Sequence, residues 1–481
     1  METTDSLLQQ EPTQDKEWAW IEVHGAKLPD VRFKKSLAAI CQKIHQQPGV
    51  SFSRACEAKR KAGYRLVNIA EITPQDILVG HSKQTRERAK EYSFFLAASD
   101  TTSFDFTSHK ACTGLGPIAS TPKSQGFLTH SVIALSPKGV PLGVLYQQSW
   151  TRTAESFGQS NQRRSRPESE KESQKWVKAL RGVEEILQPE DSVLLIQDRE
   201  ADIVSFLQEP RRENTYLLIR SCHPRKISVK NDGNTKLEDG NANLWEAARC
   251  SPVVAKNTLS VKVKKGKEFT DRCAQLSIRY THVEIIPPVY ADKSKPNPVV
   301  WVVCAREDNP PPGFDAIEWI LLSTFPVTDS KTALDMVLFY TYRWLIERFH
   351  YVLKSGLGVE NLQLDDVDSL MKYLSFYSIV GWRLLYLTYL AREAPNTPAN
   401  YVFTDLSIKV LSAHSGKTIS SVSDAVMAVA RVGGFRPCRS APRAGVKSLW
   451  MGLRRLDGME EGWQMAFSAM SALSAKDMGQ D

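Results

Sequence analysis

The chain has 481 residues, of which 42% are hydrophobic and 9% aromatic, and its 62 Lys and Arg against 54 Asp and Glu give a formal net charge of +8. This length predicts more than one domain, and this composition excludes an intrinsically disordered chain. The first residues lack a cationic start and an apolar core, and the longest apolar stretch, SIVGWRLLYLTYLA, is short and contains Arg383. We therefore expect neither a signal peptide nor a membrane span, and a cytoplasmic location.

The N-terminal region is predicted to be helical and basic. The segment VRFKKSLAAICQKIHQ has apolar residues at helical spacing, and between Lys27 and Arg65 the cations are interrupted only by Asp30 and Glu57. A small basic helical module is a common unit for docking on DNA, although any basic helical bundle has this pattern. A second cationic stretch, Arg431 to Arg455, contains no acid. Two cationic ends favour a polyanion such as nucleic acid as the partner, and a solvated basic surface is the alternative.

The middle of the chain alternates between strand and helix patterns. YSFFLAASD reads as a buried strand, FLTHSVIALSPKGVPLGVLYQQSW as a hairpin, and SVLLIQD and NTYLLIRS as strands that flank the short helix ADIVSFLQE. A polar segment after Trp150 is predicted to be a surface loop that leads into the helix KWVKALRGVEEIL. This order predicts an α/β layer with mixed strand directions. Residues 226–318 then alternate as strands do, which predicts a β-rich insertion, and the chain beyond Asp366 is again helical.

The run YTYRWLIERFHYVLK is the most informative motif in the chain. It places Tyr340, Arg343, Glu347 and Lys354 at gaps of three, four and seven residues, so one face of a single α-helix is predicted to carry all four. The cations and the phenol can hold phosphate oxygens, whereas a carboxylate beside a phosphate needs a metal ion between the two.

Two aspartates upstream extend this motif. Asp100 and Asp198 each follow an apolar strand-like run, and we predict both at strand ends. Together with Glu347 they supply three carboxylates, enough to hold the two Mg²⁺ ions of a phosphoryl-transfer site. The alternative is structural, because an aspartate after a strand is often a turn or cap residue and Asp198 could cap the next helix. Glu347 could equally form an ordinary surface ion pair.

These motifs carry a resemblance to a known family. Asp100 followed by two threonines, the run QDREAD around Asp198, and the Tyr-Arg-Glu-Lys pattern resemble the bacterial cut-and-paste DDE transposases of the Tn-five type, the insertion-sequence-four group. LIRSCHPRK, NPPPGFDAIEWILLSTFPV and ARVGGF resemble further stretches of that transposase in the same order, so the resemblance covers about residues 18 to 465. It implies an α/β fold with an RNase H-like catalytic core at residues 78–370, in which residues 226–318 are the β-rich insertion. Residues 1–77 would be a helical end-recognition domain and residues 371–481 a helical domain for dimerisation and DNA contact.

The resemblance also implies an activity and its residues. Asp100, Asp198 and Glu347 would be the catalytic metal ligands for two Mg²⁺ ions, with Mn²⁺ as a substitute. The enzyme would nick double-stranded DNA at transposon inverted ends, form and open a hairpin, and join the end to target DNA, as a homodimer in a synaptic complex of a bacterial, nucleoid-associated protein. Trp319 would stack on an unpaired base near the end. The other DNA-binding residues would be Tyr340, Arg343, Lys354, Trp344, Arg220, His223, Arg225, Arg32, Lys34, Lys35, Arg60, Lys61 and Arg65.

Three positions depart from the family pattern. Arg348 stands where a second acid is expected, Tyr342 where a histidine is expected, and Cys222 where a lysine is expected. These changes bear on end-sequence preference and efficiency rather than on the reaction. Two other functions remain open from the residues, namely a structure-selective nuclease on the same fold and an end-binding repressor. A repressor has no use for three carboxylates beside phosphate.

Overall fold

The computed structural model describes residues 18–119, 123–153, 171–229, 243–265, 268–289, 291–439 and 442–477. The chain forms two compact units. The first, here the terminal unit, comprises Met1–Tyr92, Thr101–Asn161 and Ile346–Asp481, and the second, the central unit, comprises Ser93–Asp100 and Gln162–Leu345. The domain boundaries predicted at residues 77 and 370 stay a prediction.

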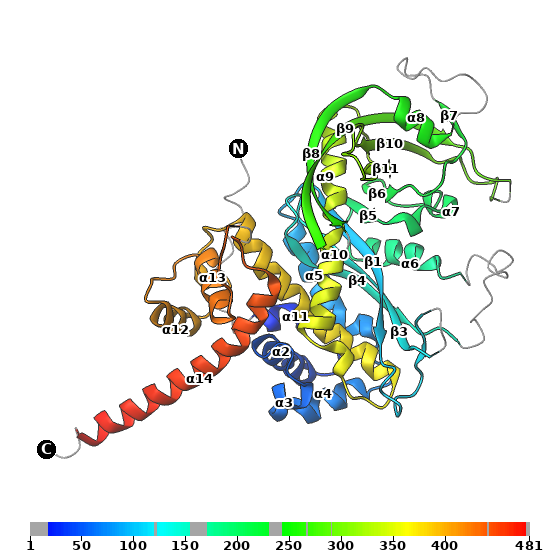
Figure 1. The fold of residues 1–481 in the computed structure, drawn as a ribbon. Helices are drawn as coiled ribbons and strands as arrows, with labels where there is room; N and C mark the ends of the chain where they lie inside the picture. Colours follow the sequence, from blue (N-terminus) through cyan, green and yellow to red (C-terminus); the bar gives the residue numbers. More distant parts are fainter. Residues whose placement is uncertain are drawn as a thin grey trace. The chain divides into compact units, whose positions relative to one another are not determined.

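Helices make up most of the terminal unit (Figure 1). Their bounds are α1 (Trp18–Val23), α2 (Val31–Gln46), α3 (Phe52–Ala55), α4 (Arg60–Val67), α5 (Pro74–Ala89), α11 (Val367–Glu393), α12 (Asp405–Ser415), α13 (Val422–Val432) and α14 (Val446–Asp477). The predicted basic helix is confirmed as α2, which Asp30 caps by accepting a hydrogen bond from the Arg32 amide. At the start of α5, Thr73 and Asp76 form a reciprocal capping box and Pro74 occupies the first turn.

Helix α11 lies at the centre of the terminal unit, where it packs against α2, α5 and β4. Most of its length is buried, including Trp382 and the guanidinium of Arg383, which is only 6% exposed. Arg383 donates to the carbonyl of Val402 at 3.2 Å and lies 5.3 Å from the ring of Trp18, so the buried cation has both a polar and an aromatic partner. This confirms the apolar stretch as a core helix. Within the described residues, no helix is long and apolar enough to cross a bilayer.

A buried polar cluster joins α1 to α5 and β4. Glu22 accepts hydrogen bonds from Arg88 at 2.6 Å and contacts His81 Nδ1 at 2.5 Å, while His81 Nε2 accepts from the Val144 amide at 2.9 Å. Since Nε2 is an acceptor, Nδ1 carries the proton that His81 donates to Glu22. The backbones approach closely here, because a Cβ on Gly80 would lie 2.7 Å from the Ala26 amide nitrogen. Two charged residues and one histidine are therefore fully partnered inside the terminal unit.

The terminal unit also contains strands. These are β2 (Gly116–Pro117), β3 (Gln125–Leu135), β4 (Pro141–Trp150) and the second half of β1, which spans Phe95–Asp105 and runs through both units. Strands β3 and β4 pair antiparallel, with Thr129 opposite Ser149, and the Gly139 amide donates to the Ser136 carbonyl in the turn. The predicted hairpin is confirmed.

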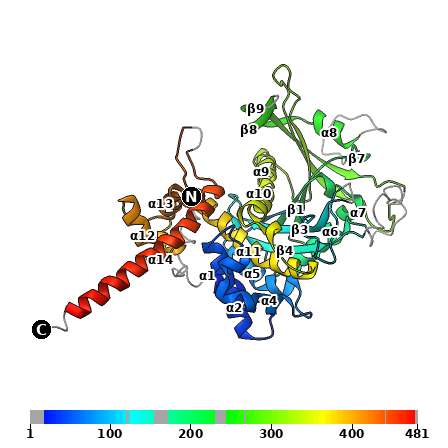
Figure 2. The same ribbon diagram turned by 60° about the horizontal axis from the view of Figure 1, so that its bottom comes forward.

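The central unit is built on a mixed sheet. Its strands are the first half of β1, β5 (Val193–Gln197), β6 (Thr215–Arg220), β7 (Ile227–Val229), β8 (Val253–Lys265), β9 (Glu268–Ile285), β10 (Val299–Arg306) and β11 (Glu318–Ser323). Strands β1, β5 and β6 pair in parallel, and β6, β11, β10, β9 and β7 follow in antiparallel order. The helices are α6 (Gln174–Glu184), α7 (Val204–Leu207), α8 (Leu244–Cys250) and α9 (Ser330–Thr341). Figure 2 shows β8 and β9 as a long antiparallel pair.

This architecture confirms the predicted α/β class with mixed strand directions and the β-rich pattern between residues 226 and 318. The RNase H-like core stays a prediction. The polar loop predicted after Trp150 falls largely at residues 154–170, outside the described part of the chain.

Candidate functional site

Two of the predicted catalytic residues lie at the same level of neighbouring strands. Strands β1 and β5 pair in parallel with Ala98 opposite Ile196. Asp100, inside β1, and Asp198, directly after β5, each come two residues beyond that pair. Because side chains alternate along extended chain, this register predicts both aspartates on the same face as the pair. Adjacent strands lie about 4.8 Å apart, so we infer from the register that the two carboxylates are neighbours in the central unit.

The position of Asp100 differs from the prediction in one respect. It lies inside β1, which continues to Asp105, rather than at the end of the strand. The end was misplaced because the fully buried run stops at Ser99, and residues 100–103 are only half-buried although the strand continues. Asp100 Oδ2 lies 3.6 Å from the Arg343 guanidinium, and both side chains are about one-fifth exposed, at 23% and 19%. The carboxylate therefore faces a cation in a half-buried setting.

Asp198 follows β5 and accepts a hydrogen bond from the Glu200 amide at 2.9 Å, so it does cap a short helical turn as the structural alternative expected. It is also half-buried. Burial raises the pKa of Asp198, and the charge of Glu200 adds to this, while the Glu200 amide, Arg343 and Lys175 oppose it. A carboxylate that is costly to ionise is one that an added cation would stabilise.

The predicted single helix through the motif is wrong. The segment consists of α9, which ends at Thr341, then α10 (Trp344–Tyr351), then a π-helical turn over Val352–Gly356. At the break, the Arg343 amide bonds only three residues back, to Tyr340, and the Thr341 hydroxyl bonds the Leu338 carbonyl at 2.6 Å. Such hydroxyl contacts compete with helical hydrogen bonds and bend a helix.

The four motif residues consequently occupy different segments. Tyr340 lies in the last turn of α9, Arg343 in the break, Glu347 in the first turn of α10 and Lys354 in the π-turn. Glu347 and Lys354 belong to the terminal unit, and Tyr340 and Arg343 to the central unit. The grouping of Glu347 with the two aspartates stays a prediction. Within the terminal unit, Lys354 lies 3.8 Å from Glu360 and 5.5 Å from the ring of Phe104 in β1.

Tyr340, Trp319 and Arg220 form a cluster in the central unit. The rings of Tyr340 and Trp319 meet edge to face at 5.4 Å, and the Tyr340 phenol is hydrogen-bonded with the Arg220 side chain. Burial raises the pKa of the Tyr340 phenol, which is only 7% exposed, against the charges of Arg343 and Arg220. Trp319 is half-buried, and Trp344 is 56% exposed. The half-buried ring of Trp319 therefore packs against the buried ring of Tyr340.

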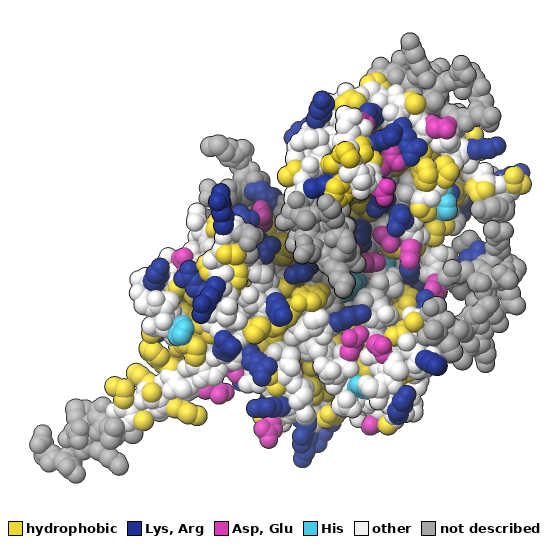
Figure 3. Space-filling model, in the orientation of Figure 1, with side chains coloured by type: hydrophobic (Ala, Val, Ile, Leu, Met, Phe, Trp, Pro, Cys, Tyr) yellow, Lys and Arg dark blue, Asp and Glu magenta, His cyan; other side chains and the backbone are white. Residues whose placement is uncertain are grey.

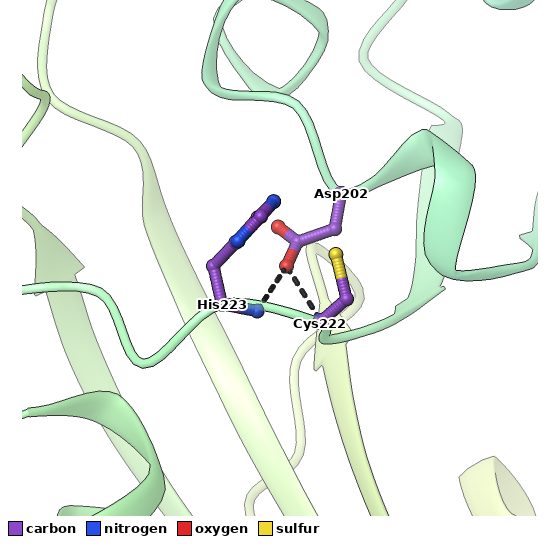
Figure 4. Close-up of side chains that lie close together, drawn as sticks. All are labelled: Asp202, Cys222 and His223. Atoms are coloured by element: carbon purple, nitrogen blue, oxygen red, sulfur yellow. Dashed lines mark hydrogen bonds between the residues drawn. The ribbon is translucent and has the colours of Figure 1, made fainter.

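Asp202, which the sequence analysis did not single out, organises the loop that follows β6. Its side chain lies within reach of Cys222 and His223, and together the three could hold a metal ion (Figure 4). However, Asp202 Oδ2 already accepts from the amides of Cys222 and His223 at 2.7 and 3.2 Å. Its Oδ1 accepts from Arg225 at 2.7 Å. Because both carboxylate oxygens of Asp202 already accept hydrogen bonds, we assign this cluster to stabilising the loop after β6 rather than to binding a metal ion. The position of Asp202 in QDREAD was its only signal in the sequence.

This arrangement separates the predicted DNA-binding residues of the loop. His223 is exposed, whereas Arg225 is paired with Asp202, and its side chain is only 12% exposed. The structure therefore favours His223 as the residue available to a partner and gives Arg225 a structural role.

The predicted end-recognition cations lie on α2, α4 and their flanks in the terminal unit. Arg60, Lys61 and Arg65 are exposed, as is Arg32, which pairs with Asp30 at 2.8 Å. Lys35 is also exposed, while Lys34 donates to the His24 carbonyl at 2.9 Å. Lys and Arg side chains are widely spread over the face shown in Figure 3.

Residues 463–470 of α14 in the terminal unit include exposed apolar side chains (Figure 3). They include Trp463 at 42% exposure, together with Met465, Phe467 and Met470. The predicted dimerisation role of this region stays a prediction.

With this geometry in place, comparison with known proteins supplies the general class. Residues 15–72 match the family model described as Transposase DNA-binding. The match supports a transposase. It covers the segment that contains α1 to α4 and the exposed cations described above. A solved structure of a piggyBac transposase synaptic complex with hairpin DNA is similar over 96% of this chain and 78% of that chain, at 10% identity and a TM-score of 0.34. A likeness this weak carries no argument about fold or function.

Proposed function

We propose that this chain is a DDE transposase that cuts and joins DNA at transposon inverted ends. The observation that carries the proposal is the register of β1 and β5, which sets Asp100 beside Asp198 in a chain whose residues 15–72 match a transposase DNA-binding model. A DNA-binding module alone fits a repressor, and two adjacent carboxylates alone fit a nuclease. Their combination favours a transposase.

The donor set fits magnesium. Asp100 and Asp198 offer hard oxygen ligands at one level of the sheet, and Glu347 is the third carboxylate that we assign to the site. Mg²⁺ ions held there would lower the pKa of an attacking water or 3′-hydroxyl and stabilise the leaving oxyanion. The raised pKa of Asp198 also fits, because burial outweighs the Glu200 amide, Arg343 and Lys175 that favour the ionised form, and an added cation would favour that form further.

Arg343 has a distinct role in this proposal. Its guanidinium lies 3.6 Å from Asp100, so it balances that carboxylate in the chain alone. A guanidinium can also donate two parallel hydrogen bonds to the oxygens of one phosphate. We assign Arg343 to holding a DNA phosphate next to the carboxylates, with Lys354 and exposed His223 as further phosphate or base contacts.

Trp319 supplies the surface for an unstacked base in this proposal. Its ring is half-exposed and braced by Tyr340 at 5.4 Å, which keeps its orientation fixed. Stacking on an aromatic ring is worth roughly 1–3 kcal/mol per base, which offsets part of the cost of unpairing a base for hairpin formation. The strand pairings support the RNase H-like core: β1 pairs with β3 in the terminal unit and in parallel with β5 in the central unit, and β5 pairs in parallel with β6.

The test is to incubate the full chain with Mg²⁺ or Mn²⁺ and a DNA that carries its native inverted ends, and to resolve the products on a denaturing gel. Nicks and hairpins at the end boundary are the expected products. Binding to the ends without cleavage would point to the repressor, and cleavage unrelated to the ends would point to the nuclease. Size measurement of the DNA-bound complex tests the homodimer.

A further inference from the structure

The β-rich insertion contributes an ion pair at the residue next to Trp319. Arg249 on α8 donates to both oxygens of Glu318, at 2.8 Å from Nε and 2.5 Å from Nη2. Glu318 is the first residue of β11 and immediately precedes Trp319. The side chains are 35% and 24% exposed, so this is a half-buried two-point contact rather than a loose surface pair. Two-point Arg–carboxylate contacts fix orientation as well as distance.

The backbone at Trp319 pairs with β10 on one edge of β11 and has a shorter pairing on the other edge. Strand β6 pairs with β11 over Leu321–Ser323, and the Ser221 amide extends this edge to the Ile320 carbonyl. Beyond that point the β6 ladder stops, and the Glu318 carbonyl instead accepts from the Arg220 side chain at 3.3 Å. On this edge Glu318, the first residue of β11 and the neighbour of Trp319, is therefore held by the side chains of Arg220 and Arg249.

Charge gives a second reason for the pair. An ionised Glu318 would repel a phosphate backbone that approaches Trp319 and Arg220. Arg249 holds the pKa of the Glu318 carboxyl below its usual range through its hydrogen bonds, so the residue stays ionised and paired. Arg306, opposite Glu318 in the β10–β11 register, adds a weaker contact at 3.6 Å.

We propose that Arg249 is a positioning residue that, through its two-point contact with Glu318, sets the orientation in which Trp319 accepts an unstacked base. The inference rests on the function proposed above. Arg249 lies on α8, between β7 and β8 of the β-rich insertion, so the proposal gives this insertion a role in positioning Trp319 during the reaction. It also predicts a defect confined to the step that needs the unstacked base.

The experiment uses the full chain and end DNA with 2-aminopurine at the near-terminal position. It measures end binding, nicking, hairpin formed per nick, and the fluorescence of the reporter base. For Arg249→Gln, we expect normal binding and nicking, a loss of about tenfold in hairpin per nick, and a reporter signal that no longer changes on binding. The swap Arg249→Glu with Glu318→Arg should restore both readouts to within about twofold, because it rebuilds the pair in reverse.

Arg306→Gln is the matched control, since it removes the same charge from the same carboxylate at a longer contact. We expect it to stay within about twofold of the unmodified chain. Hairpin formation by Arg249→Gln at the unmodified ratio, or an equal loss in Arg306→Gln, would overturn the positioning role while leaving the proposed function intact. If the unmodified chain nicks but forms no hairpins, both proposals fall together. If Arg249→Gln does not fold, the swap decides: a folded swap variant without hairpins overturns the inference.

Discussion

Asp100 and Asp198 occupy equivalent positions two residues beyond the Ala98–Ile196 pair on parallel strands β1 and β5. Parallel strands carry equivalent positions to the same edge of a sheet, so two segments nearly a hundred residues apart in the chain present their carboxylates together. The relationship depends only on backbone register within the central unit. It is the reason that a metal-dependent reaction is proposed here.

The raised pKa of Asp198 predicts that removing this carboxylate, which we assign to the active site, makes the folded chain more stable. In the folded chain burial favours the protonated form, so ionisation costs stability at neutral pH, and this cost disappears as the pH falls towards the ordinary range of an aspartate. Asp198→Asn should therefore raise the melting temperature at pH 7 without divalent metal, and the gain should shrink towards pH 4. Thermal melts of both proteins over this range measure it. A destabilised Asn variant at pH 7 would show that Asp198 is mainly a cap.

For the Glu22–His81–Arg88 cluster we predict the opposite pH dependence. Its carboxylate stabilises the folded chain at neutral pH and loses this effect in acid. Burial alone would raise the pKa of the Glu22 carboxyl, but Arg88 and His81 lower this pKa to about 2. The stability from this carboxylate is therefore complete above its ordinary pKa of 4.5 and is lost as the pH falls from there towards 2. Glu22→Ala should cost about 3 kcal/mol at pH 7, because it leaves the largely buried Arg88 without its carboxylate partner. Urea unfolding at pH 7 and pH 3 checks this, and an equal cost at both values would refute the sign.

Trp319→Ala should separate nicking from hairpin formation. Loss of a stacking surface worth roughly 1–3 kcal/mol predicts a slowing of about 5- to 150-fold in hairpin formation with nicking retained. Trp319→Phe, which keeps an aromatic face, is the control and should lose less. Single-turnover product analysis measures both steps. Normal hairpins from the Ala variant would remove Trp319 from this role.

The exposed cations of α4 predict salt-dependent end binding. If Arg60, Lys61 and Arg65 contact phosphates, each Ala variant should weaken binding to any DNA and lower the slope of log affinity against log salt by about one. A residue that reads a base should instead lose its preference for the native end. Lys417→Ala, an exposed cation outside residues 15–72, is the control. Variants that bind with unchanged affinity and slope would move the DNA surface elsewhere.

How far the sequence could predict this structure depends on the range of the interactions. Helix α2 was predicted over its observed span because the helical spacing of its apolar residues is a local signal, whereas the cap at Asp30 was found only in the structure. The break at Arg343 was missed because helical spacing continues through it, and the spacing of residues cannot reveal the Thr341 hydroxyl contact to Leu338 that accompanies the break. The Arg249–Glu318 pair joins residues 69 positions apart, so only the folded insertion brings it together.

The candidate site divides in the same way. Asp100 and Asp198 were found because each follows an apolar strand. Extended chain was also predicted after Asp100, but Asp100 itself was predicted at the end of the strand, whereas β1 runs to Asp105. Arg225 was predicted to bind DNA because it is a cation in a matching stretch, yet its pairing with Asp202 depends on a loop closing back on β5 and its short helical turn. A charge pattern identifies groups that can bind phosphate but leaves open which of them the fold already uses.

The most direct test of the central claim is single-turnover nicking of native end DNA by the unmodified chain and by Asp100→Ala, Asp198→Ala and Glu347→Ala, with end binding measured alongside. We predict that all three variants bind the ends and that each nicks at least about a thousandfold more slowly, because removing any one of several residues that act as a unit nearly abolishes the reaction. Nicking at the unmodified rate by any one of them would remove that carboxylate from the site. The same result with both aspartate variants would contradict the account as a whole.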